Sequence, residues 1–180
     1  NENVLDGTIY IWANLSGISN NFDNPYYNNY THNYSTDDYL IMNIAGSVQP
    51  IDPNMNTTNY QYISSGQGFY VKALANNATA VMDNEMRVKN ENEIFYRTNN
   101  SEKSLYKEDF DRNQLKQIWL DLKSNDTKVS QTLIGYHTNA TNEYDRGLDS
   151  EVLGISTNEI YSINETKKLV CTKAGYTRIQ

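Results

Sequence analysis

Thr8-Ile9-Tyr10-Ile11-Trp12 contains only β-branched and aromatic residues, and this stretch decides the expected fold. Such side chains fit the pleated, half-buried surface of a β-strand. Two further strands are predicted at Tyr39–Ile44 and Gly68–Leu74, and long segments rich in Asn separate the three strands. Because Asn tolerates left-handed backbone and caps its own turns, these segments, including the polar stretch Gly46–Thr58, are expected to be loops.

The C-terminal half continues the series of short strands. Residues 117–122 fit either an apolar helical face or an alternating strand. We predict a strand, because Ser124-Asn125-Asp126 follows as a turn and Gln131–His137 is its expected hairpin partner. Shorter strands are predicted at Thr79–Met82, Met86–Val88, Ile94–Arg97, Glu151–Leu153 and Glu159–Ile163.

Together these segments predict an all-β protein, an antiparallel β-sandwich of jelly-roll-like form in a single domain spanning residues 1–180. Trp12 and Trp119 are expected to be at least partly buried. The core is predicted to contain Ile9, Ile11, Ile41, Phe69, Val71, Ile118, Leu120 and Leu133.

Composition excludes several classes of function. The chain has 180 residues and a formal net charge of −7, with scattered Lys and Arg, so no nucleic-acid partner is expected. No run of apolar residues is long enough for a transmembrane helix, so no membrane span is expected. The single cysteine, Cys171, allows no disulfide within the chain.

An ordered set of segments resembles a β-sandwich region of large Bacteroidetes surface proteins, located upstream of the C-terminal sorting domain of type IX secretion. The matching segments are residues 9–12, 35–39, 63–71, 84–88, 95–97, 118–122, 135–136, 140–149 and 160–163. The resemblance implies a secreted or cell-surface location and supplies no catalytic residues. It ends near Leu169, so residues 170–180 are interpreted as an atypical tail, and the sandwich is expected to lack the last strands of that region. The chain is interpreted as a fragment of a larger secreted protein.

Asp145-Arg146-Gly147-Leu148-Asp149 is the sharpest local motif. Calcium takes six to eight oxygen ligands, and acidic turns of this kind supply them, so Asp145 and Asp149 are the candidate metal ligands. The alternative is that both carboxylates cap turns or pair with Arg146. Calcium is the one cofactor that the sequence suggests.

The segment from Phe22 to Tyr39 is the best candidate for ligand binding. Tyrosine offers a flat ring and a hydroxyl with little side-chain entropy to lose, which suits recognition surfaces. Tyr26, Tyr27 and Tyr30 are expected to stack on a sugar, and Asp37 or Asp38 to bind its hydroxyls. Alternatively, some of these rings fold back over the end of the sandwich.

The sequence therefore favours a non-catalytic extracellular module for adhesion or for binding a polysaccharide or cell-surface glycan. A structural spacer in a surface protein is a further possibility of the same kind. A fragment of a glycan-active enzyme is the alternative, because Asp37 and Asp38 are paired acids of the kind that glycosidases use. No nucleotide fingerprint, zinc motif or nucleophile elbow accompanies them.

Overall fold

A computed structural model describes residues 4–13, 38–48, 62–87, 116–124, 127–153, 159–164 and 167–174. Over these residues the regular structure is almost entirely β, with a short 3₁₀ turn, η2, at Asn84–Met86. The strands form two sheets in a β-sandwich-like arrangement, which confirms the predicted all-β class. In these ranges no helix has the length and hydropathy needed to cross a membrane.

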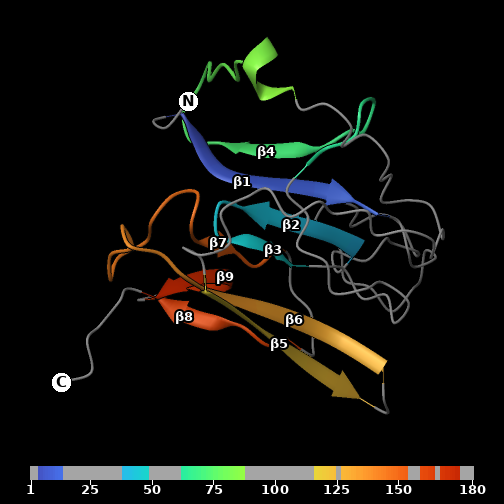
Figure 1. Cartoon of the computed structure of the whole chain (residues 1–180), viewed down its shortest axis with the longest axis vertical. Coiled ribbons are helices and arrows are strands. Elements are labelled where there is room, and N and C mark those ends of the chain that lie inside the picture. Colours follow the sequence, from blue (N-terminus) through green and yellow to red (C-terminus); the bar gives the residue numbers. More distant parts are fainter. Residues whose placement is uncertain are drawn as a thin grey trace.

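The first sheet has the strand order β3-β2-β1-β4 and is antiparallel throughout (Figure 1). Its central strand β1, Leu5–Trp12, pairs with β2, Tyr39–Asn43, and with β4, Tyr70–Ala73. The edge strand β3 covers Gly46–Val48. Three of these strands were predicted, whereas the residues of β3 were assigned to a loop.

The second sheet has the strand order β5-β6-β9-β7, with β8 also paired to β9. The bounds are β5 Lys116–Ser124, β6 Thr127–Tyr136, β7 Ser150–Glu151, β8 Ser162–Asn164 and β9 Lys167–Ala174. The predicted hairpin is confirmed, because β5 and β6 pair antiparallel with Trp119 opposite Leu133. The β6–β9 pair is parallel, in an otherwise antiparallel sheet.

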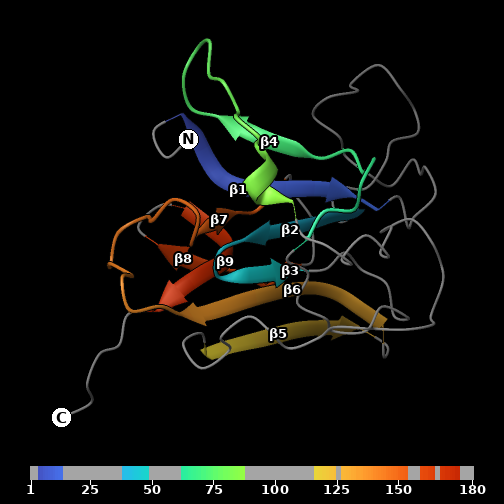
Figure 2. The same cartoon turned by 45° about the horizontal axis from the view of Figure 1, so that its top comes forward.

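The main core lies between the two sheets. Both views show the strand β3 of the first sheet next to β6 and β9 of the second (Figures 1 and 2). The buried members of this core are Tyr10, Ile41, Val48, Leu133, Val170 and Cys171. A second cluster, Ile11, Ala13, Leu40 and Met42, covers the opposite face of the first sheet with help from Ile63 and Phe69. Apolar packing on both faces explains why residues 9–12 are continuously apolar rather than alternating.

For three residues the prediction of a buried core position is wrong. Val71 is 38 % exposed, Ile118 44 % and Leu120 42 %. Val71 belongs to the edge strand β4, of which every residue is exposed. On β5 the inward positions carry Gln117 and Trp119, so the intervening apolar residues face away from the first sheet. Alternation was recognised correctly there, but the buried side was misassigned.

Other boundaries also differ from the prediction. Residues 79–82 are exposed and form no strand, and the predicted strand at Met86–Val88 begins instead in the turn η2. Ile94–Arg97 lies outside the described residues. Residues 170–174, assigned to an atypical tail, belong to β9 and place Val170 and Cys171 in the core. Residues 175–180 are also outside the described ranges.

Candidate functional site

A network of buried polar side chains joins the sheets near the start of β1. Thr8 Oγ1 donates a hydrogen bond to Asp6 Oδ2 at 3.3 Å and shares one of 2.9 Å with Ser150 Oγ. Asn43 Nδ2 donates to Ser150 Oγ at 2.8 Å, and the Tyr144 hydroxyl donates to Asp6 Oδ1 at 2.9 Å. Because Thr8 gives its single hydroxyl proton to Asp6, Ser150 must donate to Thr8. Two series of hydrogen bonds therefore end at the carboxylate of Asp6: one runs from Asn43 through Ser150 and Thr8, and the other comes directly from Tyr144.

This network has a structural purpose. Asp6 is almost fully buried, and a buried carboxylate is costly unless hydrogen bonds replace its lost water. Its donors come from β1 itself and from Tyr144, while Asn43 on β2 and Ser150 on β7 complete the chain. The network thus fixes the position of the segment before β7 against the first sheet.

The two carboxylates singled out as metal ligands lie in the connection between β6 and β7. Asp145 accepts hydrogen bonds from the backbone N–H of Thr141 at 2.6 Å and from its hydroxyl at 2.8 Å. Asp149 is fully buried, and its Oδ2 accepts the backbone N–H of Asp145 at 2.8 Å. These contacts are those of turn-capping side chains. Within the described ranges no group of three or more His, Cys, Asp or Glu side chains could hold a metal ion, and calcium binding stays a prediction.

Glu151 on β7 is an anionic centre at the rim of this region. It forms ion pairs with Lys167 and, at 3.5 Å, with Lys72 of β4. The hydrogen bond from Lys167 holds the pKa of Glu151 below its usual value. Lys167 Nζ also lies 3.8 Å from the centre of the Tyr144 ring, a cation–π contact. The ion pair with Lys72 adds a second link between the sheets.

Burial keeps the phenols and the thiol of this region protonated. Burial first, and then the charge of Asp6, raises the pKa of Tyr10 to about 12. Burial followed by the hydrogen bond to Asp6 also raises the pKa of Tyr144. The Cys171 thiol is fully buried, and burial raises its pKa as well. A thiol kept protonated is a poor nucleophile, so Cys171 suits packing rather than catalysis.

Aromatic side chains gather at the other end of the first sheet. Trp12 pairs with Tyr39 across β1 and β2, and Tyr10 pairs with Tyr70 across β1 and β4. Alternation along β1 puts Trp12 on the same face as Tyr10, so Trp12, Tyr39 and Tyr70 share one face. The rings of Tyr39 and Tyr70 meet edge to face, with centroids 6.1 Å apart and an interplanar angle of 69°. We call these three residues the aromatic end.

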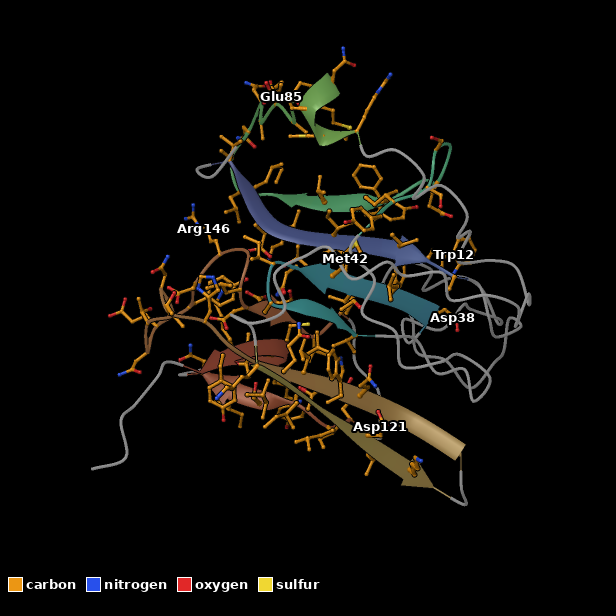
Figure 3. All side chains as sticks on the ribbon, in the orientation of Figure 1. Trp12, Asp38, Met42, Glu85, Asp121 and Arg146 are labelled. Carbon is orange, nitrogen blue, oxygen red and sulfur yellow. The ribbon has the colours of Figure 1, made fainter. Side chains whose placement is uncertain are left out.

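Exposure at the aromatic end is graded. Trp12 and Tyr39 are half-buried, whereas Tyr70 is 61 % exposed. Figure 3 shows Trp12 and Asp38 close to the same end of the sheet, away from Arg146 in the β6–β7 connection. The aromatic end and the buried polar network therefore occupy opposite ends of the first sheet.

The interval 14–37, which contains most of the predicted binding segment, is joined to the described structure at this aromatic end on both sides. The backbone N–H of Ala13 donates to the carbonyl of Asp38 at 2.9 Å, which brings together the two points where the chain leaves β1 and enters β2. Asp38 is described and is buried. The other predicted ligand contacts lie outside the described residues: Tyr26, Tyr27, Tyr30 and Asp37.

Neither the aromatic end nor the polar network was anticipated as a unit. The signal for the network was the pair of polar residues, Asp6 and Thr8, within the otherwise largely apolar strand β1. The aromatic end had no local signal, because Tyr39 and Tyr70 are far apart in the sequence and meet only through the pairing of their strands with β1.

Comparison with known proteins gives one result. No curated protein and no solved structure is significantly similar to the chain. A family model described as a domain of unknown function, DUF8693, matches residues 1–174, which include every described strand. The chain therefore belongs to the DUF8693 family.

Proposed function

We propose that this chain is a non-catalytic module of a secreted or cell-surface protein and that it binds a glycan through the aromatic end. The observation that carries the proposal is the exposed ring of Tyr70 held edge to face against Tyr39. The extracellular location rests on the sequence resemblance to surface proteins of type IX secretion.

The aromatic end has the chemistry that a sugar-binding surface needs. The C–H face of a pyranose ring packs on an aromatic face, and the phenol hydroxyl adds a hydrogen bond. Tyr39 is set by its position in β2 and its contact with Tyr70, so little side-chain freedom remains to be lost on binding. A preorganised aromatic surface of this kind favours adhesion to a sugar polymer over bond-making chemistry.

The interval that contains the predicted aromatic loop is joined to the described structure beside this surface. Residues 14–37 leave β1 after Ala13 and return at Asp38, beside the aromatic end. Tyr26, Tyr27 and Tyr30 fall within this interval of the sequence. We therefore propose that these tyrosines and Tyr70 belong to one binding surface.

The net negative charge of the chain bears on which glycans it can bind. The net charge of −7 repels uronate and sialate polymers at low ionic strength. We therefore propose that the ligand is a neutral polysaccharide.

The experiment is a glycan array that carries neutral and acidic polysaccharides, followed by affinity measurements on the best ligand. Tyr70→Ala is expected to weaken binding about tenfold or more, which corresponds to about 1.4 kcal/mol. Val71→Ala is the matched control, because Val71 lies on the same strand but on its opposite face. The combined change of Tyr26, Tyr27 and Tyr30 to Ala is expected to abolish binding in a folded protein.

Three results would overturn the proposal. Equal affinity of the Tyr70→Ala protein and the parent would place the site elsewhere. Binding to no glycan on the array would favour the structural spacer. Release of reducing sugar from the polysaccharides would favour the glycan-active enzyme.

A further inference from the structure

The sequence holds an unusual number of acceptor motifs for N-linked glycans. Asn-x-Ser/Thr, in which x is any residue except Pro, is the motif that oligosaccharyl transferases recognise. It starts at Asn14, Asn29, Asn33, Asn56, Asn77, Asn99, Asn125, Asn139 and Asn164. Chance placement of the Asn, Ser and Thr residues of this chain gives about four such motifs, roughly half of those present.

The structure distinguishes an asparagine that supports the fold from asparagines that lie in an acceptor motif and are exposed to solvent. Asn43 is not in a motif, and its side chain is used internally by Ser150, Leu148, Ala45 and Gly46. Asn77 and Asn139 both begin an Asn-Ala-Thr motif and both are exposed in turns. An acceptor asparagine has to lie in such a position, because the glycan is bulky and has to remain in solvent.

Of these two asparagines, Asn77 is the more accessible acceptor for a glycan. It follows β4, in a turn where its backbone has a φ of 58°, and Thr79 is also exposed. Neither side chain forms a hydrogen bond with another described residue. In the second motif the hydroxyl of Thr141 donates to Asp145 at 2.8 Å, so the group that the transferase must recognise is already engaged.

The location of Asn77 is compatible with ligand binding at the aromatic end. Leu5 pairs with Ala73, and the N–H of Leu74 donates to the carbonyl of Val4 at 2.8 Å. The turn at Asn77 therefore starts near the beginning of β1, whereas Trp12 ends that strand. Figure 2 shows the segment after β4 near the N-terminus, at the opposite end of the first sheet from the arrowhead of β1.

We infer that Asn77 carries an N-linked glycan, donated by a lipid-phosphate-linked oligosaccharide. The side-chain amide nitrogen of Asn77 forms a bond to the anomeric carbon of the first sugar. The bond from that carbon to the phosphate oxygen breaks, the lipid phosphate leaves with the electron pair, and a base of the transferase takes the amide proton. Oxidation states are unchanged. Such transferases act on exported chains, which agrees with the location proposed above.

The test is peptide mapping by mass spectrometry of the protein isolated from the cells that produce it, with fragmentation that keeps glycans attached. Trypsin cuts after Lys72 and Arg87, so Asn77 falls in a peptide that holds no other acceptor motif. The peptide is expected to carry added hexose-containing mass localised to Asn77. Occupancy at Asn139, in a separate peptide, is expected to be lower.

Matched variants made in the same cells distinguish glycosylation that depends on the acceptor motif from non-specific modification of the peptide. Thr79→Ala is expected to abolish the added mass, whereas Thr79→Ser and Asn76→Gln are expected to retain it. Both positions are exposed, so the fold should tolerate these changes. Recovery of the Asn77 peptide only in unmodified form overturns the inference, as does modification that survives Thr79→Ala.

Discussion

Replacement of Gly7 by Ala tests how the β6–β7 connection is docked on the first sheet. Gly7 has a φ of 84°, and a Cβ at this position would lie 2.7 Å from both Cα and N of Gly147. The neighbouring contact is a hydrogen bond of 3.2 Å from the N–H of Gly147 to the carbonyl of Asp6. Both contacted atoms are backbone, so no side chain can move aside, and the connection itself would have to shift.

The free-energy cost of Gly7→Ala can be estimated from two effects, the left-handed backbone and the close contact with Gly147. An L-residue in left-handed backbone costs about 1–2 kcal/mol, and overpacking against a fixed neighbour costs about 1–3 kcal/mol. Gly7→Ala is therefore expected to lower the free energy of unfolding by about 2–5 kcal/mol. For a chain of this size the corresponding fall in Tm is about 4–20 °C.

Two other glycines serve as graded controls. Gly66 has a φ of 82° but nothing within 4 Å of an added Cβ, so Gly66→Ala is expected to show the backbone cost alone. Gly147 has a φ of 78°, and its Cβ would meet only the end of the Ile44 side chain at 3.2 Å, so Gly147→Ala is expected to fall between the two.

Urea unfolding followed by circular dichroism gives the free energies, provided that the three variants share one m-value. If Gly7→Ala is no more destabilising than Gly66→Ala, the close approach of Gly7 and Gly147 does not exist in solution.

Three further predictions concern the core, an ion pair and calcium. Leu133→Ala is expected to cost about 2–5 kcal/mol because Leu133 is fully buried, and Leu120→Ala well under that because Leu120 is exposed; similar thermal melts for the two variants would contradict the core assignment. The pKa of Glu151 is lowered from 4.5 in the folded state, so its contribution to stability is complete above pH 4.5 and is lost as the pH falls through the folded-state pKa. The difference in urea midpoint between the parent and Glu151→Gln should therefore be present at neutral pH and vanish in acid, and a difference independent of pH would argue against the ion pair. A calcium site at Asp145 and Asp149 would raise the Tm in millimolar calcium by mass action, whereas an unchanged Tm would leave both residues as turn caps.

Many of the strands could be predicted from the local pattern of side-chain types in the sequence. The runs at Thr8–Trp12 and Tyr39–Ile44 are rich in β-branched and aromatic side chains, and both became strands of the first sheet. The β5–β6 hairpin was also predictable, because a turn sequence separates two runs of compatible period. Residues 79–82 share the composition of a strand, yet they find no pairing partner among the described residues and remain irregular. Composition alone does not supply the backbone hydrogen bonds that a strand needs.

Less of the candidate site was predictable. The turn around Asp145 and Asp149 was predictable, since acidic residues around a glycine mark a turn at short range, whereas their role as metal ligands stays a prediction. The sequence did not indicate that Asp6 and Tyr144 would meet, because their hydrogen bond spans 138 residues of chain. The same holds for Tyr39 and Tyr70, whose contact requires β1 to lie between their strands.

By itself the sequence determined which segments could become strands, because strand preference depends on side-chain branching and on the alternation of near neighbours. Only the tertiary structure decided which face of each strand is buried, and so why Leu133 is in the core while Ile118 and Leu120 are in solvent. It also decided the parallel pairing of β6 with β9 and the assembly of the aromatic end. These features depend on which strands pair, and that choice is made by the packing of residues distant in the chain.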